Sequence, residues 1–130
     1  MTKKNYNIED LFKALADRTR LRLIGLIGDS EVCVCFFVAI LKTSQPKISR
    51  HLAYLRRAQI VAARREGKWM HYRLTEPPDE HASRIFREVR ASLGEHPEFQ
   101  RDRESLVKVC CAVNLPVQLR RAPRPLDLAA

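Results

Sequence analysis

The spacing of apolar residues predicts three helices in the first third of the chain. Apolar side chains three or four positions apart predict a short amphipathic helix over residues 7–16, namely Ile8, Leu11, Phe12 and Leu15. Asp17 or Thr19 is a candidate cap for a second helix, which Gly28-Asp29-Ser30 ends. The compact apolar run from Cys35 to Leu41 predicts a third, buried helix of about two turns.

A fourth helix is predicted from residue 45 onward. A hydroxyl of Thr43 or Ser44 is expected to cap it, and Pro46 falls in the first turn, where its missing N–H costs nothing. The inward stripe consists of Ile48, Leu52 and Leu55. The outward face carries cations together with amide and hydroxyl groups, which suit phosphates and base edges: Ser44, Gln45, Lys47, Ser49, Arg50, Tyr54 and Arg57, with His51 near the margin.

Two neighbouring features turn this helix into part of a DNA-binding arrangement. It follows the third helix across the three-residue turn Lys42-Thr43-Ser44, which is helix-turn-helix spacing. Residues 60–74 then predict a β-hairpin that turns at Gly67, with Trp69 and Tyr72 as packing residues. Its tip is expected to carry three cations for backbone contact, Arg64, Arg65 and Lys68. The predicted fold is mainly α with a β-hairpin wing, a winged helix-turn-helix.

The chain beyond Glu76-Pro77-Pro78 predicts a long helix and then a shorter one. The long helix covers residues 79–94, and its apolar stripe needs a partner, which the amino-terminal helix of this chain or of a second copy can supply. A further short helix is expected over 98–111. We therefore expect a DNA-binding and dimerisation domain over 1–95, a helical extension over 96–113 and a flexible Pro/Arg tail over 114–130.

Composition and charge narrow the partners. The 130 residues suit one domain, no apolar run approaches the ~20 residues of a membrane helix, and the start lacks the apolar stretch of a secretory signal. We therefore expect a cytoplasmic protein with no membrane partner. The chain has a net charge of +9, and most of this excess lies in residues 44–74, which contain eight Lys or Arg residues and one Glu. That block indicates a nucleic-acid backbone as partner.

Four cysteines form two close pairs, Cys33 with Cys35 and Cys110 with Cys111. In a reducing compartment such pairs indicate metal or redox ligands. The alternative is a small metal or thiol protein that buries its thiols and binds no DNA, although it would not need the basic block. The sequence shows no Ser/His/Asp set, glycine-rich phosphate loop or carboxylate pair at productive spacing, so we do not expect an enzyme.

Four segments together resemble the ArsR/SmtB metalloregulators, and among them the arsenic-responsive repressors. They are Ala14–Leu23, Glu31–Cys35, Ser44–Leu52 and Arg65–Leu74, and the resemblance covers roughly residues 8–95. It implies a homodimeric winged-helix repressor that binds double-stranded operator DNA without ligand. It also implies release of the operator when trivalent arsenic or antimony binds cysteine thiolates.

The chain departs from that family pattern at two places. Arsenic sensors carry a third cysteine where this chain has Val38, so Cys33 and Cys35 offer two thiolates to an ion that takes three. Cys110 and Cys111 are candidates to complete the shell, whereas a monomethylated trivalent arsenical needs only two thiolates. Zinc- and cadmium-sensing relatives hold their ion on the long helix; there Asp79, His81 and Glu95 match but Ser92 replaces a histidine. Oxidation of the thiols is an alternative signal on the same scaffold.

Helix geometry restricts how Cys33 and Cys35 can share one ion. On an undistorted helix, residues two apart point roughly 200° apart, so both sulfurs face one ion only at an unwound or frayed helix start. The pair directly precedes the first helix of the helix-turn-helix. We expect thiolate capture to reshape that helix start and shift the Gln45–Arg57 helix from its DNA-fitting position.

Overall fold

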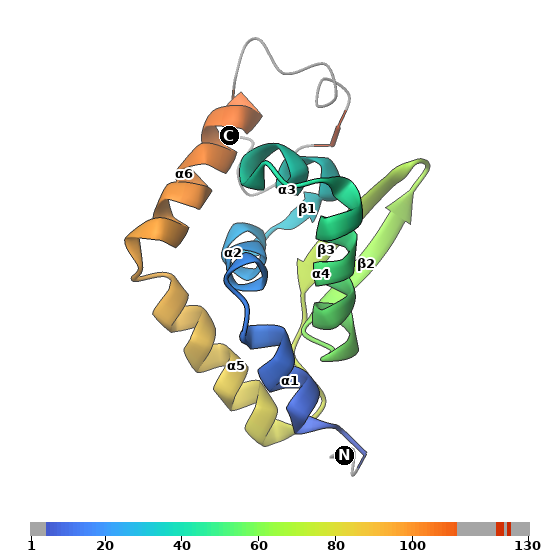
Figure 1. The fold of residues 1–130 in the computed structure, drawn as a ribbon, viewed down its shortest axis with the longest axis vertical. Helices are drawn as coiled ribbons and strands as arrows, with labels where there is room; N and C mark the ends of the chain where they lie inside the picture. The colour runs from blue at the N-terminus through green and yellow to red at the C-terminus, as the bar shows by residue number, and fades with distance from the viewer. Residues whose placement is uncertain (1–4, 112–121, 124, 126–130) are drawn as a thin grey trace.

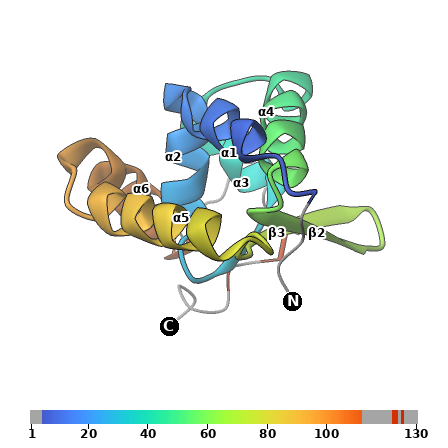
Figure 2. The same cartoon turned by 90° about the horizontal axis from the view of Figure 1, so that it is seen from below.

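A computed structural model describes residues 5–111 and three positions of the carboxyl-terminal segment, 122, 123 and 125. Its elements follow one another as α1 (Ile8–Leu15), α2 (Arg18–Ile27), β1 (Glu31–Cys33), α3 (Val34–Leu41), α4 (Gln45–Arg57), β2 (Val61–Glu66), β3 (Trp69–Leu74), α5 (Glu80–Leu93) and α6 (Pro97–Cys111). The hairpin of β2 and β3 extends away from the helices (Figure 1, Figure 2). Within the described ranges, no helix is long and apolar enough to cross a membrane.

Capping side chains account for the start of α2 but not for that of α4. Asp17 accepts a hydrogen bond from the backbone N–H of Arg20 and so caps α2, as the sequence predicts. Ser44 is the N-cap residue of α4, but its hydroxyl accepts no backbone N–H. The hydroxyl of Thr43 donates instead to the carbonyl of Leu41. The predicted hydroxyl cap of α4 was therefore wrong, because neither candidate side chain turns toward the first α4 amides.

The sheet has three antiparallel strands in the order β1-β3-β2, one more than the predicted hairpin. β1 joins the outer side of β3 and places Cys33 opposite His71. On the other side of β3, His71 lies opposite Arg64. Gly67 adopts φ 60°, a left-handed conformation that favours glycine. The hairpin thus turns at the residue where the sequence predicted the turn.

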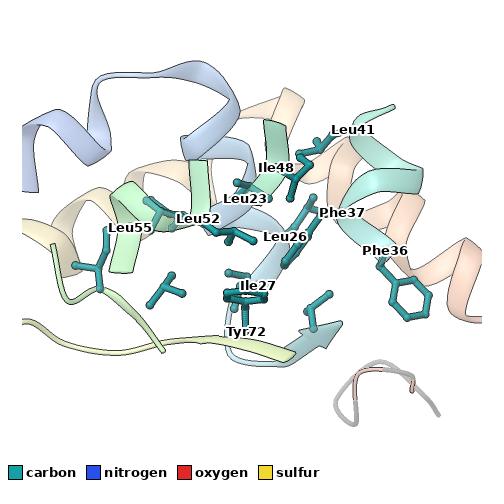
Figure 3. Close-up of a cluster of buried hydrophobic side chains, with 14 of the residues drawn as sticks. Leu23, Leu26, Ile27, Phe36, Phe37, Leu41, Ile48, Leu52, Leu55 and Tyr72 are labelled. Carbon is teal, nitrogen blue, oxygen red and sulfur yellow. The ribbon is translucent and has the colours of Figure 1, made fainter. Parts of the chain in front are cut away.

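The core lies between α2, α3, α4 and the sheet. Figure 3 shows the inward stripe of α4 facing apolar side chains of α2, with Tyr72 of β3 beneath them. Ile48, Leu52 and Leu55 are at most 1 % exposed, which confirms the predicted stripe. The Tyr72 ring is buried with its centroid 6.3 Å from that of Phe37, as expected of a packing residue. This core fixes α4 against α3, the arrangement predicted for a helix-turn-helix.

The carboxyl-terminal helices pack on α2. The main partner of α5 within the chain is α2, whereas α1 lies mainly on α4. The expectation that α1 of the same chain covers the α5 stripe was therefore wrong, because α1 is occupied by α4. α6 has fifteen residues, Pro97–Cys111, close to the predicted range 98–111, and it packs on α2.

An ion pair with little solvent access fixes α6 to α2. The guanidinium of Arg22 donates two hydrogen bonds of 2.9 Å to the carboxylate of Asp102, which is 6 % exposed. Arg103 donates to the carbonyl of Leu26. The division of the chain at residue 95 stays a prediction, and the predicted tail 114–130 falls almost wholly outside the described residues.

Candidate DNA interface and dithiol site

The two sulfurs of Cys33 and Cys35 lie together where β1 becomes α3. Cys33 is at once the last residue of β1 and the N-cap residue of α3, with extended φ −72° and ψ 142°. Its Sγ atom lies 3.1 Å from Sγ of Cys35, which donates the hydrogen bond. Cys33 is fully buried and Cys35 is half-buried. The helix start thus brings both thiols to one side, which an undistorted helix would not do.

The contact separates the acidities of the two thiols. The hydrogen bond from Cys35 lowers the pKa of Cys33 to about 6, against the opposing effect of burial. The pKa of Cys35 is raised well above its ordinary range, because its proton is held between the sulfurs and because the site is buried. The lowered pKa of Cys33 favours its thiolate at neutral pH, the form that binds soft ions.

A buried histidine lies beside the pair on the neighbouring strand. His71 is 4 % exposed, and its Nε2 atom lies 3.0 Å from Oε1 of Glu66 near the wing tip. The positive charge of a protonated His71 contributes to the lowered pKa of Cys33. His71 therefore lies between the dithiol and the wing: it is opposite Cys33 in the sheet, and its ring contacts Glu66 near the wing tip.

The second cysteine pair ends α6. Cys110 is 1 % exposed and lies on α6, which contacts α3. The side chain of Cys111 is not among those that the structure describes. Among the described residues, no three His, Cys, Asp or Glu side chains gather closely enough to hold a metal ion. The described part of the chain therefore presents a two-sulfur site at Cys33 and Cys35.

The zinc-type ligand positions on the long helix do not converge either. Asp79 caps α5 by accepting from the backbone N–H of Ala82, and His81 is exposed. Among the described residues of this single chain, no three His, Cys, Asp or Glu side chains gather there. Asp79 therefore has a structural role at the start of α5.

The outward face of α4 presents nearly all of the predicted DNA-contacting side chains to solvent. The exposed members are Ser44, Gln45, Lys47, Ser49, Arg50, Tyr54 and Arg57. His51 is partly covered, which agrees with its predicted place at the margin. Lys47 and Arg50 carry charges that suit phosphates, while Gln45 offers a donor with an acceptor and Arg50 offers paired donors, the groups that suit base edges.

Sequence reasoning missed Arg20, which lies behind this face. Its NH1 group lies 3.2 Å from Nδ1 of His51, and its guanidinium carbon lies 4.3 Å from the ring centroid of Tyr54. Arg57 approaches the same ring at 5.8 Å. Two of the predicted contact residues, His51 and Tyr54, are thus already engaged by the protein itself.

The wing keeps two of its three predicted cations at the tip. Arg65 and Lys68 are exposed near the Gly67 turn, with Nζ of Lys68 5.1 Å from the Trp69 ring centroid. Arg64 lies deeper in β2 and donates to Glu31 at 2.6 Å. The expectation of a cluster of three tip cations was wrong for Arg64, because β1, which was not predicted, places a carboxylate beside it.

Comparisons with known proteins agree with this geometry. The family described as "Bacterial regulatory protein, arsR family" matches residues 17–63. The "Arsenical resistance operon repressor" of Escherichia coli K12 is 53% identical over 66 residues, which cover 50% of this chain and 56% of that protein. An uncharacterized HTH-type transcriptional regulator of Methanocaldococcus jannaschii is 45% identical over 64 residues, 48% of this chain and 72% of its own length.

A solved structure shares the fold beyond the matched segment. The homodimeric winged helix-turn-helix DNA-binding domain from Mycobacterium bovis superimposes with a TM-score of 0.55 at 29% identity. The match covers 69% of this chain and 81% of that one. The chain spans little more than half the length of the Escherichia coli repressor that it matches. The winged helix-turn-helix fold is thus confirmed.

Proposed function

Because the chain belongs to the ArsR family of bacterial regulatory proteins, we propose that it is a cytoplasmic transcriptional repressor that binds operator DNA as a homodimer. The DNA contacts come from α4 and from the wing tip. Trivalent arsenic is the inducer, and its binding to Cys33 and Cys35 releases the operator. The observation that carries the proposal is the 3.1 Å separation of the two sulfurs at the start of α3.

The position of the sulfurs supports release without a long relay. α3 is the first helix of the helix-turn-helix and is separated from α4 by Lys42, Thr43 and Ser44. Arsenic binding replaces the S–H···S hydrogen bond by two arsenic–sulfur bonds, and we expect this exchange to reshape the start of α3. Only the difference in ligand affinity between the two conformations shifts the DNA equilibrium, so the adjustment has to oppose the DNA-fitting position of α4.

The number of thiolates decides which inducer binds best. Cys33 and Cys35 suffice for a methylated trivalent arsenical, whereas arsenite or trivalent antimony takes a third thiolate from Cys110 or Cys111. This thiolate comes from the same chain or from the second copy in the dimer. The contact between α6 and α3 supports participation of the α6 cysteines.

The direct test measures operator release in cysteine variants. Fluorescence anisotropy of a labelled inverted-repeat operator should show release from the wild-type protein as arsenite is added. The variant Cys33→Ser/Cys35→Ser should bind the same DNA and ignore arsenite. Normal release from this double variant would contradict the proposed inducer site. X-ray absorption of the bound arsenic then gives its sulfur coordination number.

The matched variant Cys110→Ser/Cys111→Ser tests the second pair. If these cysteines supply the third ligand, arsenite should show two sulfur neighbours in place of three, and its release of DNA should weaken. Response to methylarsenite should persist, because Cys33 and Cys35 remain. An unchanged arsenite response and coordination number would remove the α6 cysteines from the site.

Two α4 side chains test base readout. Gln45→Ala or Arg50→Ala should weaken operator binding and relax sequence preference, by roughly 1–3 kcal/mol of discrimination for each lost bidentate contact. The measurement compares affinities for the operator and for single-base variants of it. Equal losses on operator and random DNA would show that these residues do not read bases.

Thiol oxidation is a second candidate signal, and the same site favours it. A thiolate 3.1 Å from a thiol is placed for disulfide formation. Peroxide should then release DNA and a thiol reductant should restore binding, whereas release by arsenite under reducing conditions identifies the metalloid response. Mass spectrometry of the Cys33–Cys35 peptide distinguishes the two products.

A further inference from the structure

Arg20 joins three segments of the DNA-binding domain by contacts that no motif assigns. Its Nε donates at 3.0 Å to the carbonyl of Ala14, and NH2 donates at 2.8 Å to the carbonyl of Lys13, both in the last turns of α1. Its NH1 group donates to Nδ1 of His51 on α4. One guanidinium of α2 thus bonds the end of α1 and the middle of α4.

Stacking on Tyr54 completes the contact on the solvent side. The guanidinium carbon of Arg20 lies 4.3 Å from the Tyr54 ring centroid, the closest of the cation–ring approaches in the described residues. The ring is 41 % exposed, so it shields the guanidinium on one face only. His51 and Tyr54 are three residues apart, and Arg20 therefore holds adjacent positions of one α4 face.

These contacts fix a degree of freedom that the apolar stripe leaves loose. Ile48, Leu52 and Leu55 hold α4 against the core, but side chains of similar shape permit small rotations and shifts along the helix. A planar guanidinium with directed N–H groups does not. Figure 2 shows α1, α2 and α4 grouped together, and the hydrogen bonds of Arg20 connect all three helices.

We propose that Arg20 is a positioning residue for operator readout: it sets the rotation of α4 about its axis and does not itself bind DNA. This inference rests on the proposed DNA-binding function. Three N–H groups of Arg20 donate to acceptors of the protein itself, so its guanidinium is already bound within the domain. Its effect on DNA binding passes through Gln45 and Arg50, whose approach to base edges depends on how α4 is turned.

The test substitutes Arg20→Lys, which keeps the charge and loses the planar fork. A DNA sequence is first selected from a random pool with the wild-type protein. Arg20→Lys should bind the selected sequence about tenfold more weakly, the effect of one disturbed base contact. Its affinity for random DNA should change by less than about twofold, with an unchanged salt slope, because no phosphate contact is lost.

Arg22→Lys is the matched control, two residues along the same helix. Arg22 also makes a forked contact, but with Asp102 on α6, away from α4. Its loss should lower stability without changing the ratio of selected to random DNA affinity. An equal change of that ratio in Arg22→Lys would overturn the positioning role. A salt slope lowered by about 0.9 in Arg20→Gln would overturn it too, by assigning Arg20 to a phosphate.

A second residue keeps the test valid if Arg20→Lys does not fold. Tyr54 is exposed, so its substitution leaves the core intact. Tyr54→Phe keeps the ring that stacks on Arg20 and should lose much less selectivity than Tyr54→Ala, which removes the ring. Loss of selectivity in Tyr54→Phe would assign the hydroxyl to DNA and contradict the proposal. If the wild-type protein enriches no sequence at all, the DNA-binding function fails, which is a different outcome.

Discussion

Glu31 accepts three hydrogen bonds of 2.6 to 3.1 Å from Arg64, so the first residue of β1 is tied to β2, the first strand of the wing hairpin. The contact lowers the pKa of the Glu31 carboxyl, because it stabilises the charged form. Two residues after Glu31 comes Cys33, the proposed ligand. If β1 moves on ligand binding, as we propose, this contact is expected to pass the movement to the wing as well as to α3.

We predict that Glu31→Gln weakens the response to the inducer. Without the ion pair, β1 should adjust to arsenic with less effect on the wing, so saturating arsenite should weaken operator binding by a smaller factor than in the wild type. Operator affinity is measured by anisotropy with and without saturating arsenite. Glu76→Gln is the control, because Glu76 pairs with Arg87 of α5, away from the sheet. Equal release from both variants would show that the ion pair carries no coupling.

The lowered pKa of Cys33 gives a titration that Cys35 should control. Ultraviolet absorbance of the thiolate should rise with an apparent pKa of about 6. Cys35→Ala removes the hydrogen bond and should move the pKa toward the ordinary value of about 8.5, whereas Cys35→Ser retains a donor and should shift it less. Identical titrations of the two variants would show that the hydrogen bond is not the cause.

The same shift predicts how stability depends on pH. Between pH 6 and about 8.5 the folded state binds fewer protons at Cys33 than the unfolded state does. The stabilisation from this group therefore grows as pH rises across that window and is lost as pH falls through 6. Urea unfolding of wild type and Cys33→Ser across this range measures the difference. A difference that is constant with pH would contradict the assignment.

Substitution of Lys68 and of Arg64, two cations of the wing, should change the salt dependence of DNA binding by different amounts. Lys68 is exposed at the turn, whereas Arg64 is bound by Glu31. Lys68→Gln should lower the slope of log affinity against log salt by about 0.9, and Arg64→Gln should lower it less. Both are measured on random-sequence DNA, where base readout does not contribute. A larger change for Arg64→Gln would mean that it leaves Glu31 to bind phosphate.

The ion pair of Arg22 and Asp102, which connects α2 to α6, should contribute strongly to stability. Asp102→Ala leaves the guanidinium of Arg22 without its two charge-assisted hydrogen bonds and should cost about 2–3 kcal/mol of unfolding free energy. Glu80→Gln breaks an exposed pair with Arg84 and should cost less than about 0.5 kcal/mol. Chemical denaturation measures both. Equal small losses would show that α6 is not held by this pair.

Periodicity in the sequence predicted the elements whose signal repeats over several turns. The stripe of Ile48, Leu52 and Leu55 identified α4, and Gly67 identified the hairpin turn. β1 was missed because three residues are too few to show an alternating pattern, and its pairing with β3 is a long-range contact. The error at Arg64 follows directly, since its partner Glu31 belongs to that missed strand.

The candidate site was predictable where it depends on local geometry. Helix geometry allowed Cys33 and Cys35 to face one ion only at a frayed helix start or an unwound turn, and in the structure α3 begins between them. Arg20 was not predictable, because two of its acceptors are backbone carbonyls, which every residue carries and which leave no mark in the sequence. Its ring partner on α4 becomes a neighbour only in the folded chain.

The change from strand to helix at Cys33 limits how this chemistry can be transplanted. Shifting the junction by one position would turn one sulfur toward the opposite side of α3 and separate the pair. Grafting the hexapeptide Glu31–Phe36 onto another winged helix should therefore confer affinity for soft ions only in hosts whose backbone makes the same switch at the same residue. A graft must therefore reproduce the change from strand to helix at Cys33, because the position of the two sulfurs depends on it.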